Sequence, residues 1–386
     1  MKSQGPTYHA RMDDLILELL RAAPLIDGHN DLLWALRDAR EETGEEPDVG
    51  QACPQLHTDL PRSHAGGLGA QFWSVYVPSH LPTEEAVTKT LEQIDALYEL
   101  IRKHPARLEL ARTADDVERI TRAGRIASMI GVEGGHSIGG SLGTLRILAR
   151  LGAGYLTLTH NDDTPWADSA TGEHPHGGLT GFGEEVVREL NRLGVLVDLS
   201  HVSDDTMRQA IEVSEAPVIF SHSSTRALCD VTRNVPDDVL ELIGRTGGVV
   251  MVTFVPSFVA PEGAEANRAS WEEARELRAR HADDPQALHA AMERWWISLE
   301  EVAATAAQVA DHIDHVRAVA GIDHIGVGGD FDGARAMPAG LEDVSGYPAL
   351  FTELAARGYT DEELQQVAGR NVLRVMREAE LAATKA

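Results

Sequence analysis

The sequence predicts an α/β protein built as a (β/α)₈ TIM barrel. Three observations lead to this prediction: eight apolar segments typical of strands follow one another, helical segments separate most of them, and ionisable residues stand just after several of them. Alternating strands and helices are typical of a parallel sheet, and eight such units close into a barrel. The strands are expected at residues 24–28, 71–77, 126–132, 154–159, 195–199, 217–220, 248–254 and 324–328.

Helices with an apolar face are expected between these strands. Their ranges are 13–21, 84–103, 142–151, 184–193, 204–213 and 236–244. Residues 38–69 are typical of a polar loop, and we interpret His57 and His64 within it as surface histidines. We expect residues 1–386 to form one barrel domain, with an acidic helical insertion at about 256–300.

Composition excludes several classes of partner. The chain of 386 residues has a formal net charge of −27, which argues against nucleic acid and anionic membranes, because both favour basic surfaces. No run approaches the roughly 18 apolar residues of a membrane helix. The first ten residues lack an apolar signal core, and Cys53 and Cys229 are too few for a disulfide framework. A cytoplasmic protein is therefore expected.

Ionisable residues stand just past the C-terminal ends of six different expected strands. They are His29, Glu133, His160, His201, His222 and Asp330. Active sites of barrels lie on the face where the strands end, so these side chains are expected to converge on one site.

Three imidazoles and two carboxylates of this region favour a metal centre. His29 and Asp31 are two residues apart, so on an extended chain their side chains leave the same face. The expected ligands are His29, Asp31, Glu133, His201 and His222, which is more than one catalytic zinc ion needs. Two zinc ions sharing a hydroxide fit better, with Glu133 as the bridging carboxylate.

Seven segments resemble a known family. They are DGHNDL (27–32), GVEGGHSI (131–138), YLTLTHND (155–162), LSHVS (199–203), PVIFSHSS (217–224), RNVPDD (233–238) and GGDFDG (328–333). In this order they resemble the membrane dipeptidase, or renal dipeptidase, family of zinc hydrolases with an amidohydrolase-type barrel. The similarity covers about residues 24–377 and implies a soluble, bacterial-type member.

The resemblance implies that a zinc-bridging hydroxide hydrolyses L-Xaa-L-Xaa and L-Xaa-D-Xaa dipeptides. His29 and Asp31 match ligands of one zinc ion, His201 and His222 match ligands of the other, and Glu133 matches the bridge. Three further matches concern the substrate. His160 matches the histidine that contacts the scissile carbonyl, Arg233 the arginine that binds the terminal carboxylate, and Asp330 the acid that exchanges protons with the bridging water and the leaving amine.

Other functions stay open at this point. Another amidohydrolase reaction, such as deamination or lactone hydrolysis, would use the same metals, although such enzymes usually carry His-x-His where this chain has Asp31. A non-catalytic metal-binding protein would have no need of His160 and Asp330. Val255 and Phe258 stand where mammalian members carry tyrosines, which leaves substrate preference open, and tryptophans at 271, 295 and 296 suggest a lid or a homodimer contact.

Overall fold

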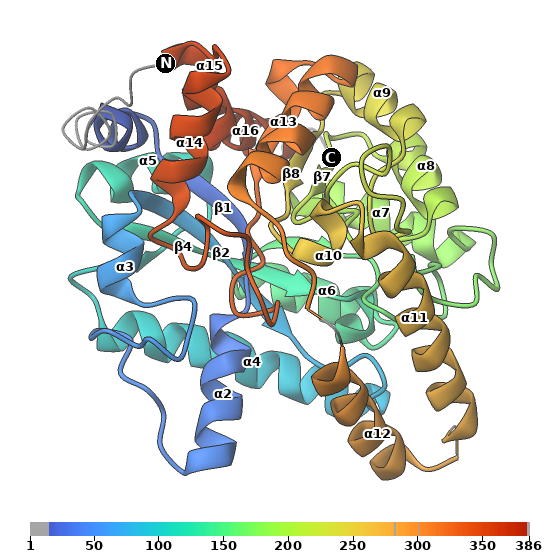
Figure 1. Ribbon diagram of the computed structural model, residues 1–386. Helices are drawn as coiled ribbons and strands as arrows, with labels where there is room; N and C mark the ends of the chain where they lie inside the picture. The colour runs from blue at the N-terminus through green and yellow to red at the C-terminus, as the bar shows by residue number, and fades with distance from the viewer. Residues whose placement is uncertain (1–14, 282, 300, 384–386) are drawn as a thin grey trace.

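The computed structural model describes residues 15–281, 283–299 and 301–383, and eight parallel strands form a closed barrel with helices around it (Figure 1). The barrel closes because β1 pairs with β9 at one seam and β2 pairs directly with β4 at another. The strands are β1 (Leu25–Asn30), β2 (Leu68–Tyr76), β3 (Leu108–Leu110), β4 (Ile126–Glu133), β5 (Ala153–Thr157), β6 (Leu196–Asp198), β7 (Ile219–Phe220), β8 (Val249–Val252) and β9 (Ile325–Val327). The predicted fold class is confirmed.

One strand in this set, β3, lies outside the barrel and was not predicted. β5 begins beside Ile130, so the first half of β4 has an open edge, and β3 pairs there, with Leu108 opposite Ile126. Three residues leave too short an apolar run for a periodicity argument, so such a strand is recognised only from its neighbour.

The predicted helices are present, with one correction to a predicted loop, but the helices Ala114–Arg122 and Ala306–Val319 and those after β9 were not predicted. The segment 38–69, predicted as a loop, contains the second half of α2 and all of α3. The predicted helix at 13–21 is seen as a helix over 15–22, and its first two residues lie outside the described part of the chain. The bounds are α2 (Leu32–Thr43), α3 (Leu60–Ala65), α4 (Thr83–Lys103), α5 (Ala114–Arg122), α6 (Leu142–Arg150), α7 (Gly181–Leu193), α8 (Asp204–Val213), α9 (Asp237–Thr246), α10 (Pro256–Val259), α11 (Gly263–Arg280), α12 (Pro285–Ser298), α13 (Ala306–Val319), α14 (Tyr347–Ala356), α15 (Asp361–Gln365) and α16 (Asn371–Ala383).

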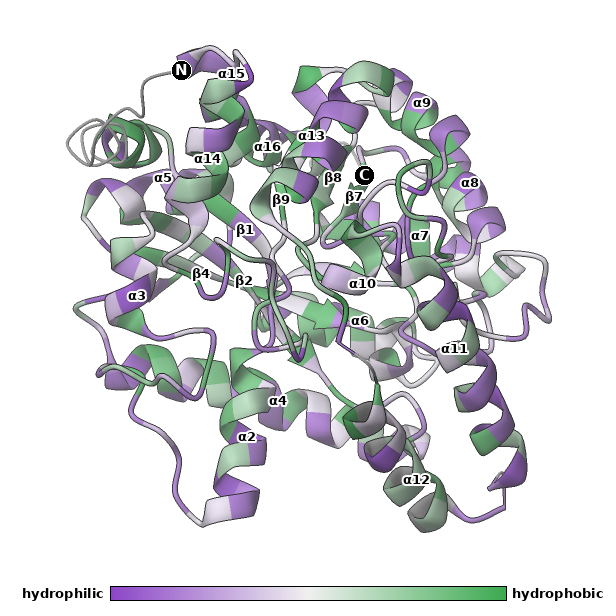
Figure 2. Cartoon of the chain, in the orientation of Figure 1, coloured by the Kyte–Doolittle hydropathy of each residue, from purple (hydrophilic) through white to green (hydrophobic). Residues whose placement is uncertain are grey.

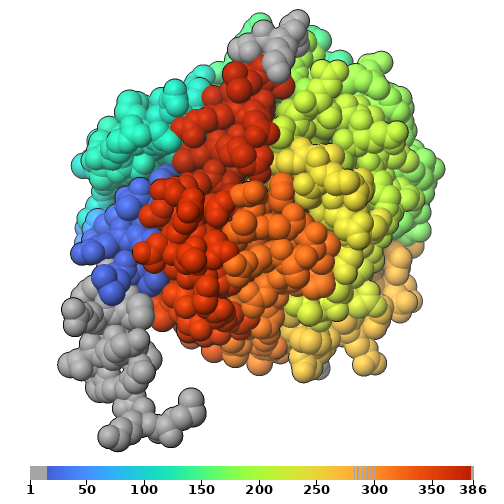
Figure 3. Space-filling view, turned by 90° about the horizontal axis from the view of Figure 1, so that it is seen from above, coloured from blue at the N-terminus to red at the C-terminus, as the bar shows by residue number. Residues whose placement is uncertain are grey.

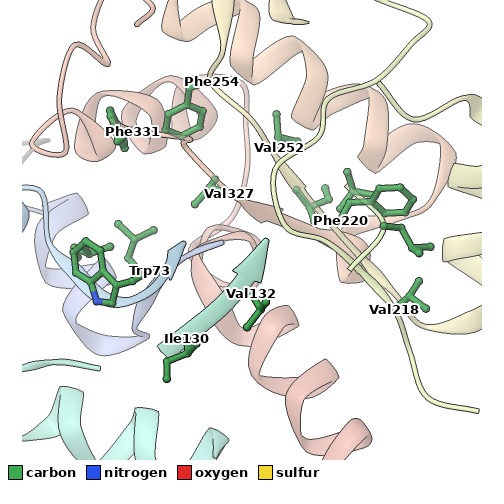
Figure 4. Close-up of a cluster of buried hydrophobic side chains, with 14 of the residues drawn as sticks. Trp73, Ile130, Val132, Val218, Phe220, Val252, Phe254, Val327 and Phe331 are labelled. Atoms are coloured by element: carbon green, nitrogen blue, oxygen red, sulfur yellow. The ribbon is translucent and has the colours of Figure 1, made fainter. Parts of the chain in front are cut away.

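Alternation along β4 shows how the strands place the site. Ile130 and Val132 belong to the large apolar cluster that fills the space between strands and helices (Figure 4). Met129 belongs to a second cluster, with side chains of other strands such as Phe72. Because side chains on a strand alternate between its faces, Glu133 shares the face of Met129 and points into the barrel at its C-terminal end.

The beginning and the end of the described chain lie side by side. The first and last strands of the barrel pair in the same region. In Figure 3 the first segment, in blue, adjoins the last helices, in red. Asp27 of β1 pairs with Val327 of β9 at this seam. Among the described helices, none combines the length and the apolar composition needed to cross a bilayer.

The insertion after β8 consists of α10, α11 and α12. α11 is largely hydrophilic in Figure 2, and Trp271 of α11 packs on Trp295 of α12, with ring centroids 5.2 Å apart. Arg278 of α11 forms an ion pair with Asp162, its Nε lying 2.6 Å from Oδ1. Since Asp162 follows His160 by two residues, the insertion contacts the loop that carries a predicted site residue.

Candidate metal centre

The C-terminal ends of β1 and β7 meet because glycine allows close approach. A Cβ on Gly28 would lie 2.2 Å from the carbonyl oxygen of Ser221, and a Cβ on Gly328 would lie 1.9 Å from it. The residues that follow Gly28 and Ser221 are His29 and His222, and their ring centroids are 3.8 Å apart. Two imidazoles that are distant in sequence, those of His29 and His222, thus lie next to each other.

Four imidazoles converge on a single carboxylate oxygen, Oε1 of Glu133. The distances from this atom to the Nε2 atoms are 3.1 Å for His201, 3.5 Å for His29, 3.5 Å for His222 and 3.8 Å for His160. Of these five side chains, all but His160 are less than a tenth exposed. A carboxylate oxygen has two lone pairs and accepts about two hydrogen bonds, so Oε1 alone does not satisfy four imidazole nitrogens.

Asp31 and Asp330 extend the cluster on the side of His29. Nε2 of His29 lies 3.2 Å from Oδ2 of Asp31. Three overlapping groups have ligand atoms within 4.8 Å of one another: His29, Glu133 and His222; Glu133, His160 and His201; His29, Asp31 and Asp330. The structure therefore brings together all six residues predicted from strand ends, together with Asp31.

The donor set fits divalent metal ions. Nε2 of His29 is buried and has no hydrogen-bond partner among the described residues, while Nε2 of His201 and Nε2 of His222 are 2.9 Å apart. Converging lone pairs of imidazole and carboxylate are the arrangement that zinc and similar ions require. Glu133 is common to two of the three groups, as a bridging carboxylate would be.

Tyr155 fixes the ring of His29. Its hydroxyl lies 2.8 Å from Nδ1 of His29 and donates to the carbonyl oxygen of Gly28 at 3.3 Å. The hydroxyl therefore accepts from Nδ1–H, which leaves the Nε2 lone pair directed at the cluster. Space for the tyrosine comes from Gly131, where a Cβ would lie 2.1 Å from Cζ of Tyr155.

A serine fixes His222 in the same way. Nδ1 of His222 lies 2.8 Å from Oγ of Ser221, and this hydroxyl donates to Oδ2 of Asp198 at 2.7 Å. Asp198 therefore acts on His222 through Ser221. On β2, the Ser74 hydroxyl donates to Oε2 of Glu133 at 3.1 Å, which orients the other oxygen toward the imidazoles.

Burial decides the protonation of most of these groups. Burial lowers the pKa of His160 to about 4, and it holds the pKa values of His201 and His222 well below the ordinary value. Burial also raises the pKa of Asp330, and the charges of Asp31 and Glu133 add to this effect. The imidazoles of His160, His201 and His222 are therefore neutral, and Asp330 keeps its proton to a higher pH than an ordinary aspartate.

Arg233 is a buried cation beside the cluster. Its side chain is 2% exposed, and Nη1 has no hydrogen-bond partner among the described residues. Its guanidinium carbon lies 5.3 Å from the ring centroid of Phe258. Burial lowers its pKa to about 10, so it stays charged at neutral pH. An unpartnered buried guanidinium is well suited to an anionic ligand.

Positive φ angles occur at two of the site residues. His201 has φ of 68° and Asp330 has φ of 59°, a region in which residues other than glycine are uncommon. Such conformations tend to cluster at functional sites, where surrounding contacts enforce them. Nothing in the sequence of these segments indicated this feature.

Some residues around the site have roles that differ from those expected. His57 is half-buried rather than a surface residue, because its Nδ1 accepts the backbone N–H of Asp332 at 3.1 Å. Asp27 accepts the backbone N–H of His29 at 2.8 Å. Tyr155 and Ser74 were missed altogether, because the first contacts His29 across the barrel and the second contacts Glu133 from the neighbouring strand, so neither leaves a local signal.

The family follows from the sequence profile described as "Membrane dipeptidase (Peptidase family M19)", which matches residues 14–386. The chain belongs to the membrane dipeptidase family. Dipeptidase 3 of Mus musculus, a relative in this family, is 41% identical over 375 residues, which cover 96% of this chain and 67% of that protein.

Solved structures agree with this family and with the barrel. The probable dipeptidase PvdM from Pseudomonas aeruginosa has a TM-score of 0.80 at 25% identity, covering 97% of this chain and 100% of that one. A metallo peptidase from Rhodobacter sphaeroides, liganded with a phosphinate mimic of the dipeptide L-Ala-D-Ala, has a TM-score of 0.73 at 28% identity, covering 92% of this chain and 99% of that one. Both the predicted family and its barrel are confirmed.

Replacement of Tyr155 by Phe in this dipeptidase-family protein is expected to weaken metal binding by about 10- to 100-fold. The change removes only the hydroxyl that accepts from Nδ1 of His29, so the ring loses the partner that fixes its tautomer and orientation. Competition with a chelator of known affinity measures the effect.

Tyr98→Phe is the matched control for this variant. The Tyr98 hydroxyl donates to the carbonyl of Leu151 at 2.7 Å, away from the cluster, so its loss should leave metal affinity unchanged. Identical chelator titrations for the two variants would rule out a role for Tyr155 in orienting His29.

The metal-free protein is expected to lose stability as the pH falls from 6.5 to 5. Buried histidines whose pKa is lowered stay neutral in the folded state, whereas in the unfolded chain they take up protons below about pH 6.5. The unfolded state then binds more protons, and the free energy of unfolding falls. For His160, whose folded pKa is about 4, the loss is about 2 kcal/mol by pH 5.

Urea unfolding at the two pH values measures this loss, and His160→Gln isolates one residue. The pKa of His29 is raised despite its burial, because the carboxylates of Glu133 and Asp31 favour the protonated ring. His29 is therefore protonated in both states below about pH 6.5 and adds little slope there. His160→Gln should reduce the pH dependence by about 2 kcal/mol. An unchanged dependence would contradict the assignment of a lowered pKa to His160.

Proposed function

We propose that this protein hydrolyses the peptide bond of dipeptides with two divalent metal ions, zinc in the first instance. The observation that carries the proposal is the convergence of four imidazole nitrogens on Oε1 of Glu133, beside the buried guanidinium of Arg233. A metal-dependent dipeptidase is also what the family membership and the solved relative with a dipeptide mimic support.

The ligands of the two ions would share one carboxylate. We assign His29 and Asp31 to the first ion, His201 and His222 to the second, and Glu133 to both. Bound metal ions supply Lewis-acid polarisation of a carbonyl and lower the pKa of a water molecule. Tyr155 and Ser221 orient the imidazoles for this purpose, as described above.

Three residues would act on the substrate. His160, neutral because its pKa is low, donates a hydrogen bond from its ring where negative charge develops on the carbonyl oxygen. Asp330, whose pKa is raised by burial, carries a proton that it transfers to the leaving nitrogen. Arg233 binds the terminal carboxylate with two parallel hydrogen bonds.

The carboxylate contact bears on stereochemistry. A guanidinium that binds only the terminal carboxylate does not discriminate between the L and D configurations of the C-terminal Cα. We therefore propose that the protein hydrolyses L-Xaa-D-Xaa dipeptides as well as L-Xaa-L-Xaa dipeptides. The one-domain organisation of residues 1–386, a homodimer and a cytoplasmic location stay predictions from the sequence.

A panel of L,L- and L,D-dipeptides tests the function. Release of amino acids is followed with the zinc-loaded protein, with chelator-stripped protein, and after zinc, manganese or cobalt is added back. Cleavage that is lost on stripping and restored by one of these metals supports the proposal. If the zinc-loaded protein cleaves no dipeptide but deaminates a substrate or opens a lactone, the proposed function is replaced by another amidohydrolase reaction. If the protein binds metal and catalyses none of these reactions, the proposed function is replaced by a non-catalytic metal-binding role.

A further inference from the structure

Arg233 has little in its own contacts to fix its orientation. Nη1 has no hydrogen-bond partner among the described residues, and the guanidinium lies over the face of the Phe258 ring. A long side chain of this kind carries about 2 kcal/mol of rotamer entropy. Its position therefore depends on how rigidly the backbone at residue 233 is placed relative to α10, which carries Phe258.

The segment that carries Arg233 has neither helix nor strand between β7 and α9, and a neighbouring side chain ties it to α10. The amide nitrogen of Asn234 donates to the carbonyl of Phe258 at 2.8 Å and to the carbonyl of Cys229 at 2.9 Å. Its amide oxygen accepts the backbone N–H of Ser224 at 3.3 Å. These contacts lie within the segment and α10 themselves.

His312 of α13 connects the same two segments from outside. Its Nδ1 accepts the backbone N–H of Thr225 at 3.0 Å, and its Nε2–H donates to the carbonyl of Val259 at 2.9 Å. Thr225 in turn forms a β-bridge with Val235, two residues after Arg233. One imidazole, 1% exposed, thus sets the distance between the backbone that carries Arg233 and the helix that carries Phe258.

The hydrogen bonds also fix the protonation of this ring. Because a backbone N–H donates to Nδ1, that nitrogen carries no proton, and the single proton sits on Nε2, where it reaches Val259. The His312 side chain is therefore used as one acceptor and one donor in fixed geometry. A residue needed only to fill the core would not require two such contacts, because a leucine of similar volume packs without them.

We propose that His312 is a positioning residue for the carboxylate-binding guanidinium: by joining Thr225 to Val259, it holds Arg233 against Phe258 where the C-terminal carboxylate of a dipeptide binds. This inference rests on the proposed function, since it takes Arg233 to be the group that binds the carboxylate. His312 itself touches neither substrate nor metal ligand.

Two substitutions at residue 312 test the proposal. His312→Leu removes both hydrogen bonds and keeps a similar volume, whereas His312→Gln offers an acceptor and a donor at comparable spacing. We expect His312→Leu to raise KM for a dipeptide at least about tenfold with kcat within about threefold, and to leave KM for the corresponding dipeptide amide unchanged. His312→Gln should restore most of the affinity for the dipeptide.

Asn191→Ala is the control for a general loss of stability. Asn191 makes a similar double contact at the opposite end of β7, accepting the backbone N–H of Glu215 at 2.7 Å and donating to the Ser214 hydroxyl at 3.1 Å. It should lower the melting temperature without changing KM for either substrate. Equal KM changes for dipeptide and amide in His312→Leu, or no change, would overturn the positioning role.

Crystal structures of the two variants give a readout that does not depend on turnover. In His312→Gln the Arg233 guanidinium should stay over the Phe258 ring, at the 5.3 Å seen here, and in His312→Leu it should leave that ring. Arg233 unmoved in His312→Leu would overturn the inference even if dipeptides are cleaved. Arg233 displaced in a protein that cleaves no dipeptide would support the structural role of His312 while refuting the proposed function.

Discussion

Glu133→Gln is expected to lower kcat/KM for dipeptides by at least about 1000-fold, which corresponds to about 4 kcal/mol of transition-state stabilisation. Oε1 of Glu133 lies 3.1 to 3.8 Å from four imidazole nitrogens, so this one charge faces every histidine of the cluster. A glutamine keeps the volume but removes the charge and can offer only one oxygen. The carboxylate that we propose to be shared by two ions is then lost, and we expect fewer bound metal ions per chain.

Metal content by mass spectrometry and steady-state kinetics at saturating metal separate the two parts of this effect. Glu189→Gln is the control, because Glu189 pairs with Arg192 and Arg146 on the outer helices and makes no contact with the cluster. Glu133→Gln with two ions bound and more than a tenth of the activity would refute the bridging role.

Arg233→Met is expected to lower kcat/KM for dipeptides by about 30- to 5000-fold, since removing one partner of a buried charge pair costs about 2 to 5 kcal/mol. The substrate carboxylate would enter a buried site with no partner. A dipeptide amide carries no such charge, so its turnover should fall far less. The ratio of dipeptide to amide turnover, high in the unmodified protein, should approach one in the variant.

Arg233→Met is expected to lower activity but not to lower the stability of the ligand-free protein. Arg233 is 2% exposed and burial lowers its pKa, both of which mark a charge that is unfavourably placed when no ligand is bound. Methionine fills a similar volume without charge, so the ligand-free variant should unfold at the same or a higher urea concentration. If Arg233→Met proves markedly less stable and discriminates between dipeptide and amide as before, the guanidinium has a structural role and does not bind the carboxylate.

The sequence alone was sufficient to predict the barrel, and it singled out ionisable side chains that the structure brings together at one end of it. The expected strands are short apolar runs, and six of them are followed within two residues by an ionisable side chain such as Glu133 or His222. The rule that parallel strands end at one face therefore places these residues together. The seven motifs added the family. The inferences of fold and family succeed because they depend on local pattern and on a property of the fold class as a whole. The role of Arg233, which no periodicity would single out, stays a prediction from the resemblance.

Only the tertiary structure decided which atoms support these residues. The contact of Tyr155 with His29 and that of His312 with Thr225 join residues more than 80 positions apart. Each contact requires the right side-chain direction and a donor–acceptor distance that is correct to within a few tenths of an ångström. The hydrogen bond from Ser221 to Asp198, which orients His222, depends on side-chain direction and distance in the same way. Hydrogen bonds are directional and short-ranged, so they exist only once the packed barrel has fixed both partners, and a linear pattern of residue types does not encode those distances.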